Sequence, residues 1–264
     1  MARVFTLSSG SSGNCAYIGD AKSGILVDMG KSFLRVKEDL EKNDMSLENV
    51  EAVVITHEHS DHIKGLETLC KKTDIPVYAT EKTAEKLSLQ SEIIEKNLHI
   101  IKSCEQKELQ NTKFTLFNVH HDAVDTVGVR VVTADNRRVV LSTDTGHIDD
   151  GIFEYLKDAD LNIIESNYDS NMLMCNVSYP FLLRRRIASN NGHLSNSDCA
   201  KTVLELLKVG NHRFVLAHLS EQNNTPEIAF ETVRLCLDEA GYVLDKDFEL
   251  SVAPRAEMSK MMVF

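Results

Sequence analysis

The sequence lacks several features that define large classes of proteins. It has no stretch of about 18 consecutive apolar residues, so no segment is expected to cross a membrane. Residues 1–7 lack the apolar core and cleavage site of a signal peptide, and a cytoplasmic location is therefore expected. The six cysteines are dispersed without a CxxC pair, which predicts reduced, mostly buried thiols rather than a disulfide framework.

The chain also has no excess of basic residues. Its formal net charge is −11 at pH 7, which argues against a protein that coats nucleic acid through bulk electrostatics. An enzyme that contacts a few phosphates through metals and local cations is compatible with this charge. There is no internal repeat, low-complexity tract or clear linker, and 42% of the residues are hydrophobic. We therefore expect residues 1–264 to form a single domain with a large core.

Strand and helix patterns alternate along the chain. Short apolar runs predict strands at 3–7, 15–18, 25–27, 50–55, 76–79, 98–102, 113–119, 126–133, 137–142, 161–165 and 214–217. Helical spacing is found at 33–43, 63–72, 81–87, 152–156, 181–189, 197–208 and 227–240. The Gly/Ser run at 8–14 is expected to be a hairpin loop. Strands in two batches, each followed by helices, predict an α/β fold of two sheets between helical layers.

A dense group of metal-ligand side chains follows the strand predicted at 50–55. His57, His59, Asp61 and His62 lie within six residues, on a loop that leads into the next helix. Imidazole and carboxylate at this density suit Zn, Mn or Fe. The absence of cysteine from residues 57–62 argues against a purely structural zinc finger. The alternative is a solvated loop with histidines placed by chance, but four such side chains at this spacing rarely occur without a metal.

Further polar residues stand at the ends of other predicted strands, where α/β folds place their sites. One such residue means little, because turns favour Asp and Asn. Five strand ends beside a metal cluster form a stronger signal, and the residues are Asp28, His121, Asp144, Glu165 and His218. His120 and His121 are alternative ligands. Strand alternation places them on opposite faces of the strand, and periodicity does not distinguish these faces because both are apolar.

This order of residues resembles the metallo-β-lactamase superfamily. The resemblance is carried by Asp28, the run His57-x-His59-x-Asp61-His62, His121, Asp144 and His218. It implies a four-layer αββα sandwich of two mixed β-sheets flanked by helices, with a dinuclear metal site. By this resemblance His57, His59 and His121 bind one ion, Asp61, His62 and His218 bind the other, Asp144 bridges both, and Asp28 orients ligands. The context His121-Asp122-Ala123 favours His121 over His120.

Two divalent ions, Zn, Mn or Fe, would supply hydrolytic chemistry to such a site. Imidazoles and carboxylates hold two ions about 3.5–4 Å apart, and a bridging water then loses a proton near neutral pH and becomes the nucleophile. Asp61 can bind one ion and also accept a hydrogen bond from this hydroxide. The ions stabilise the charge that develops on the substrate oxygens.

Three features favour a phosphodiester substrate. The bridging residue is Asp144, where a common dizinc lactamase would have Cys. Glu165 and His193 resemble a pair in ribonuclease Z-like enzymes, in which Glu165 orients His193 and His193 protonates the leaving alkoxide. Arg185 and Arg186 could hold phosphates through their guanidinium forks, although at most two of the three consecutive arginines can face one site. The alternatives are an ordinary strand-end carboxylate for Glu165 and a helix-flanking residue for His193.

Longer stretches resemble the YycJ-type branch of the superfamily, also called WalJ or VicX, from Gram-positive bacteria. The clearest of them are residues 9–15, 121–123, 142–147, 191–196 and 217–224. This resemblance implies a metal-dependent nuclease, with 5′–3′ exonuclease activity on DNA expected for that branch. The sequence favours DNA over RNA as the substrate only through this resemblance. No inserted β-CASP domain is visible, and the long arm of ribonuclease Z is missing, which puts tRNA processing in doubt.

Two other functions remain open at this point. A small-molecule phosphodiesterase, for example one that opens a cyclic phosphate, fits the acidic charge because a small substrate needs no basic track. A regulatory or binding protein that keeps metals for stability is disfavoured by the intact ligand set with Glu165 and His193. Ser12 and Asn14 are expected either to contact substrate or to satisfy loop backbone. The sequence neither favours nor excludes a dimer.

Overall fold

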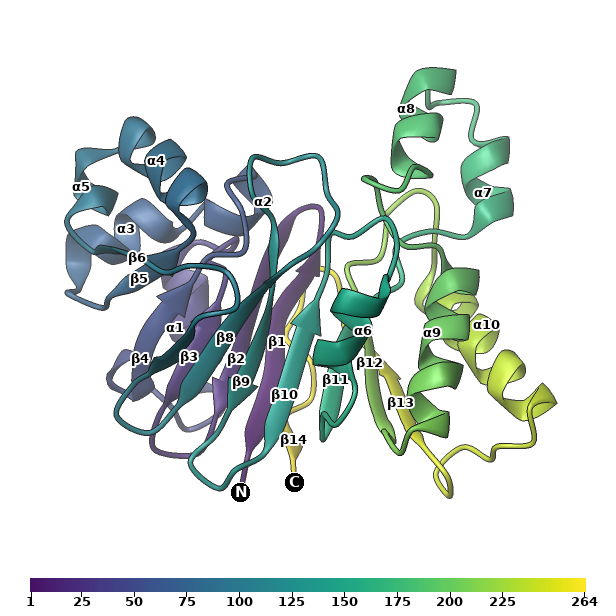
Figure 1. Ribbon diagram of the computed structural model, residues 1–264. Coiled ribbons are helices and arrows are strands. Elements are labelled where there is room, and N and C mark those ends of the chain that lie inside the picture. The colour runs from purple at the N-terminus through teal and green to yellow at the C-terminus, as the bar shows by residue number, and fades with distance from the viewer. The chain divides into compact units, whose positions relative to one another are not determined.

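The computed structural model describes residues 1–264 and divides into two compact units. The first unit comprises residues 1–118, 123–137 and 254–264, and the second comprises residues 119–122 and 138–253. The strands are arranged in two mixed seven-stranded sheets flanked by helices (Figure 1). No helix is long and apolar enough to cross a membrane. That residues 1–264 form one domain stays a prediction.

The first unit contains a complete sheet with the strand order β14-β1-β2-β3-β4-β5-β6. Its strands are β1 (Arg3–Gly10), β2 (Gly13–Gly19), β3 (Gly24–Val27), β4 (Val50–Val54), β5 (Val77–Ala79), β6 (Leu98–Ile100) and β14 (Met262–Val263). The pairs from β14 to β3 are antiparallel and those from β3 to β6 are parallel. An antiparallel meander of β7 (Gln106–Glu108), β8 (Lys113–Asn118) and β9 (Val127–Val132) also belongs to this unit.

Helices in the first unit pack on an apolar core. They are α1 (Phe33–Glu41), α2 (Ser60–Ile63), α3 (Leu66–Lys72), α4 (Glu81–Gln90) and α5 (Glu92–Glu95), with a 3₁₀ turn at Leu47–Asn49. Val36 and Leu40 of α1 and Leu69 of α3 are fully buried in the same cluster as Leu26 and Val53 of the sheet. The parallel strands β3 and β5 read as continuous apolar runs because they are buried on both faces. This core fixes the loops that follow β3 and β4.

The second unit is built on four parallel strands, β10 (Arg138–Ser142), β11 (Leu161–Glu165), β12 (Arg213–Ala217) and β13 (Glu249–Val252). Its helices are α6 (Asp150–Leu156), α7 (Ser170–Cys175), α8 (Phe181–Ile187), α9 (Asn196–Lys208) and α10 (Pro226–Glu239). Four of these helices have an N-cap residue whose side chain accepts a hydrogen bond from a backbone N–H of the first turn. The N-cap residues are Asp149, Asp169, Ser195 and Thr225. Because β10, β11 and β12 are parallel, their carboxyl ends meet at one edge.

Two local expectations were wrong. Residues 63–72 are not one helix, since the Gly65 amide donates to Met29 O at 2.8 Å and the chain breaks between α2 and α3. A Cβ on Gly65 would lie 2.0 Å from Lys31 O, so this close approach needs glycine. The Gly/Ser run is mostly strand rather than loop, because β1 and β2 pair as far as Gly10 and Gly13.

Candidate metal centre

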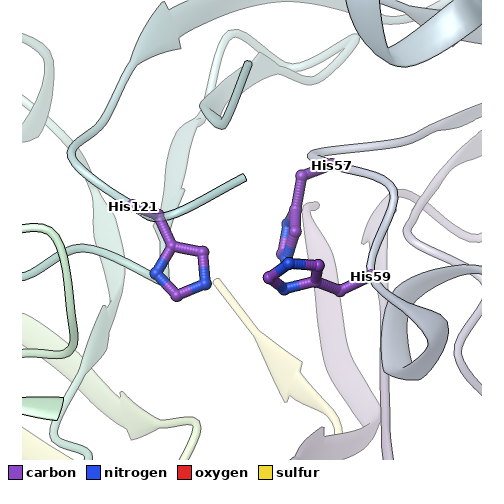
Figure 2. A group of neighbouring side chains, drawn as sticks. All are labelled: His57, His59 and His121. Carbon is purple, nitrogen blue, oxygen red and sulfur yellow. The ribbon is translucent and has the colours of Figure 1, made fainter. Parts of the chain in front are cut away.

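Each unit carries its own set of metal-ligand side chains. In the first unit, the chain leaves β4 through Thr56 and places His57 and His59 on the following loop. The two rings meet edge to face, with centroids 4.6 Å apart and planes at 75° (Figure 2). The ring of His62, from α2, lies 4.0 Å from that of His57. The three imidazoles predicted from the sequence are therefore neighbours within this unit.

Asp28 fixes the orientation of these rings. It directly follows β3 and is buried, and its Oδ2 lies 2.7 Å from His62 Nδ1. Thr56 donates its backbone N–H to Asp28 Oδ1 at 2.8 Å and its hydroxyl to Oδ2 at 2.9 Å. Since that single hydroxyl proton is given to Asp28, Thr56 Oγ1 can accept from His57 Nδ1, 3.1 Å away. Sequence reasoning assigned Asp28 an orienting role but gave Thr56 none.

Asn14 and Gly30 place Asp61 and His62. The Asn14 amide donates to Asp61 Oδ2 at 3.1 Å and lies 3.0 Å from His62 Nε2. A Cβ on Gly30 would lie 1.8 Å from Asp61 O, so only glycine allows this approach of the loop after β3 to α2. Asn14 also donates to Gly10 O at 3.2 Å, which means that it both satisfies loop backbone and holds the donor set.

In the second unit, the donors lie at the carboxyl ends of the parallel strands. Asp144, Glu165, His193 and His218 each offer one ligand-type atom within 4.8 Å of the others. Glu165 is completely buried, and its Oε1 lies 2.8 Å from His193 Nδ1 and 2.9 Å from His218 Nδ1. Oε2 accepts the backbone N–H groups of Thr145 and Leu194 at 3.0 and 3.1 Å. Glu165 is therefore the centre of a hydrogen-bonded network and not an ordinary strand-end carboxylate.

Charge pairing controls the protonation of this network. Burial alone would raise the pKa of Glu165, but the charge and hydrogen bond of His193, followed by those of His218, hold it well below its usual value. Burial likewise favours neutral His193, yet Glu165 outweighs it and raises the pKa of His193. Glu165 is thus an anion at neutral pH, and His193 keeps a proton to a higher pH than an ordinary histidine.

His121 and His120 have different environments within the second unit. His121 is nearly buried, donates Nδ1–H to Gly192 O at 3.0 Å, and has Nε2 3.8 Å from Asp144 Oδ1. Burial lowers the pKa of His121, which favours the neutral form that binds metals. His120 instead lies 2.7 Å from Asp149 Oδ2 and is half-exposed. His121 is therefore the one of the two that lies beside Asp144, and its assignment as the ligand stays a prediction.

The donor sets fit transition-metal ions. Metal-bound histidines usually give one ring nitrogen to a carboxylate, carbonyl or other acceptor, which leaves the opposite nitrogen to bind the ion. Five rings follow this pattern, each with Nδ1 beside an oxygen, namely His57, His62, His121, His193 and His218. Carboxylates from Asp61 and Asp144 complete a set of nitrogen and oxygen donors that suits Zn, Mn or Fe.

Backbone strain marks three of the strand-end residues. Asp28, Asp144 and His218 have φ values of 62°, 55° and 55°, in the left-handed region. Non-glycine residues occupy this region at a cost, and such positions gather at functional sites. Asn167 supports the strained turn at His218 by donating to its carbonyl at 2.7 Å, and Asn224 donates to the carbonyls of Ser166 and Asn167. Asn224 therefore satisfies loop backbone.

The residues expected to contact substrate are more dispersed. Ser12 lines a groove of about 910 Å³ in the first unit, together with His59, Asp61 and Lys64. Arg186 is paired with Asp122, and Arg184 donates to a backbone carbonyl. Arg185 lies over the ring of Phe181, with 5.9 Å between guanidinium carbon and ring centroid. That Arg185 and Arg186 contact a phosphate stays a prediction.

The family of the chain follows from its sequence match. Residues 24–219 match the model of the β-lactamase superfamily domain, which spans strands and donors of both units. The chain belongs to the metallo-β-lactamase superfamily. This confirms the family that the order of its histidines and aspartates led us to expect.

Relatives of named activity cover nearly the whole chain. It is 35% identical over 245 residues to the exodeoxyribonuclease YycJ of Bacillus anthracis, with 92% of each protein covered. It is also 35% identical over 247 residues to the exodeoxyribonuclease WalJ of Streptococcus pneumoniae, with 92% of this chain and 91% of the relative covered. The crystal structure of zinc-bound PqqB from Methylobacterium extorquens has a TM-score of 0.72 at 16% identity and covers 98% of this chain and 99% of that one. These matches confirm the expected branch and the two-sheet fold.

Proposed function

We propose that this chain is a metal-dependent exodeoxyribonuclease that degrades DNA in the 5′ to 3′ direction. The observation that carries the proposal is the 35% identity over 92% of the chain to two exodeoxyribonucleases. A match of that length extends over all the candidate metal ligands from Asp28 to His218 and is not confined to a short shared segment. A nuclease of this kind works where genomic DNA is, and the proposal therefore places the protein in the cytoplasm.

Two divalent ions would be held by the donors that the sequence pattern selects. In this proposal His57, His59 and His121 would hold one ion, Asp61, His62 and His218 would hold the other, and Asp144 would supply a carboxylate to both. When bound, the ions lower the pKa of water and neutralise charge on the phosphate. Asp28 and Glu165 keep His62 and His218 in the tautomer whose Nε2 can bind metal. Zn, Mn and Fe all suit these ligands.

The chain's own residues then supply proton transfers. Asp61 accepts a hydrogen bond from the attacking water and so directs it at the phosphorus. His193 donates a proton to the leaving deoxyribose oxygen, which is a poor leaving group without an acid. Glu165 raises the pKa of His193, so the acid keeps its proton to a higher pH than an ordinary histidine does. Glu165 acts through His193 and is a positioning residue in this mechanism.

A DNA strand has contacts available beside this machinery. The groove in the first unit is lined by His59 and Asp61 together with Ser12 and Lys64. In the second unit, the Phe181 side chain is 60% exposed and Arg185 covers its ring. Exposed aromatic rings with neighbouring arginines stack bases and contact phosphates in proteins that bind single strands. We expect single-stranded DNA to be the preferred polymer.

A small-molecule phosphodiesterase is the second candidate function. The net charge of −11 favours it, because an acidic protein repels a long polyanion but tolerates a small one. The two candidates share the donors and the acid. They differ in whether contacts beyond the reacting phosphate contribute to binding.

The proposal is tested by substrate class. Metal-free protein is reloaded with Mn or Zn and given single-stranded DNA, RNA of the same sequence, and a cyclic mononucleotide. We expect DNA to be cleaved fastest, Asp61→Ala to be inactive, and Asp74→Ala, at an exposed loop residue, to match the wild type. Cleavage of the cyclic compound alone would establish the second candidate. No cleavage by either metal form would leave a metal-stabilised binding protein and end the nuclease proposal.

A further inference from the structure

A second cluster of metal-ligand side chains lies in the second unit and has no part in the proposed reaction. His120, His147 and Asp149 each offer one ligand-type atom within 4.8 Å of the others. The rings of His120 and His147 are stacked, with centroids 4.0 Å apart and planes at 18°. His120 Nε2 lies 2.7 Å from Asp149 Oδ2. Two imidazoles and one carboxylate form a donor set that binds Zn, Fe and related ions.

The backbone builds this cluster before any ligand arrives. His147 donates Nδ1–H to Asn190 O at 3.0 Å, so that its Nε2 faces the cluster as an acceptor. Gly146 permits this contact, since a Cβ there would lie 2.3 Å from the Asn190 carbonyl carbon. The Gly146 amide also donates to His120 O at 2.9 Å, which ties the two ring-bearing segments together. Such control of tautomer and position is typical of metal-binding histidines.

Asp149 is fixed as an anion. Its Oδ1 accepts the backbone N–H of Ile152 at 2.8 Å and so caps α6, which leaves Oδ2 directed at His120. The hydrogen bond from Ile152, and after it the one from His120, hold the pKa of Asp149 below its ordinary value. The side chains of His120 and Asp149 are 35% and 43% exposed, so an ion can enter from solvent.

We propose that His120, His147 and Asp149 bind a Zn²⁺ ion that is separate from the two ions of the proposed reaction. Ligand atoms about 2.0–2.2 Å from zinc stand roughly 3–3.5 Å apart in a tetrahedral site. A slight opening of the His120–Asp149 contact and a small tilt of the stacked rings produce that spacing, with water as the fourth ligand. The ion would clamp residues 119–122 to the loop after β10, and these segments carry His121 and Asp144.

Metal-free protein is titrated with Zn²⁺ alone. Calorimetry measures the affinity, and metal analysis after buffer exchange measures the number of zinc ions bound per chain. We expect His147→Asn and Asp149→Asn each to bind one zinc fewer per chain than the wild type, or to bind it at least about tenfold more weakly. His212→Asn, which removes an exposed imidazole from the same unit, is the matched control and should bind as the wild type does. Asparagine is also a good helix N-cap, so Asp149→Asn removes the charge while α6 keeps its start.

Equal zinc stoichiometry and affinity in the wild type and both variants would overturn the proposal and leave a simple His–Asp hydrogen bond. Circular dichroism verifies that the variants fold, and Asp149→Asn decides the question if His147→Asn does not. The proposal does not depend on the nuclease reaction. The expected difference is one zinc whether the wild type binds three ions or only this one, and a protein inactive on DNA can still show it.

Discussion

Replacing Glu165 with glutamine tests how the second unit holds its imidazoles. The carboxylate accepts four hydrogen bonds, from His193 and His218 on Oε1 and from the amides of Thr145 and Leu194 on Oε2. Glutamine has only one accepting oxygen. Because backbone amides can only donate, that oxygen must face Thr145 and Leu194. The new NH₂ group then faces the two rings.

The rings must change tautomer to avoid a clash of donors. Each would present Nδ1 as an acceptor and carry its proton on Nε2, which removes the metal-binding lone pair of His218. We expect metal affinity to fall by about 10–100-fold. Loss of the positioned acid His193 should lower kcat by about 10²–10⁴-fold. A thousandfold loss corresponds to roughly 4 kcal/mol of transition-state stabilisation.

The same substitution has a defined effect on pH dependence. Burial lowers the pKa of His193, but Glu165 outweighs this and raises it. The protonated acid therefore persists to higher pH in the wild type, and the rate falls only as the pH rises through this raised pKa. Without the charge of Glu165 the pKa of His193 drops. The falling limb of the rate profile should move to lower pH in the variant.

Three readouts check this reasoning. Nitrogen NMR of the metal-free protein reports which ring nitrogen of His218 carries the proton, metal analysis reports affinity, and DNA cleavage reports kcat against pH. Glu154→Gln is the matched control, since Glu154 is exposed and forms only a surface pair with Lys157. A Glu165→Gln protein that keeps the proton on Nδ1 of His218, with wild-type metal affinity, would refute the assigned role.

Three further changes have defined outcomes. Asp39→Asn should lower the free energy of unfolding at pH 7 by about 1–3 kcal/mol, because buried Asp39 pairs with Lys31 at 2.8 Å. Burial raises the pKa of Asp39, but the lysine contacts outweigh this effect and lower the pKa. The stabilisation is therefore lost as the pH falls through that lowered value, and urea titrations should show a smaller difference at pH 3 than at pH 7. Gly30→Ala should lower both the melting temperature and the metal content, because its Cβ would lie 1.8 Å from Asp61 O; wild-type values would contradict this. Arg185→Ala should raise KM for DNA about tenfold, roughly 1.4 kcal/mol, with kcat unchanged in steady-state assays; an unchanged KM would remove the assigned contact.

The donors of the candidate site could be predicted because their positions in the sequence follow strand ends. Apolar runs locate the strands, and parallel strands bring their carboxyl ends to one edge. Asp28, Asp144, Glu165 and His218 could all be named in this way. The left-handed backbone at three of them depends on the folded turns and leaves no such pattern in the sequence.

Contacts between distant segments could not be predicted. The role of Thr56 depends on its hydroxyl meeting Asp28 from a neighbouring strand. The stacking of His120 on His147 depends on a backbone hydrogen bond from Gly146. Short strands such as β7, whose residues are Gln, Lys and Glu, also escaped prediction because polar edge strands lack the apolar alternation that marks a strand.

The central claim is tested most directly by the polarity of DNA cleavage. A 5′-phosphorylated single strand with a fluorescent label at its 3′ end is incubated with Mn-loaded protein and followed on a denaturing gel. A 5′ to 3′ exonuclease predicts labelled fragments that shorten stepwise while unlabelled mononucleotides are released, and Asp61→Ala should leave the strand intact. Immediate release of the label as a mononucleotide would contradict the polarity, and an unchanged strand would contradict the exonuclease itself.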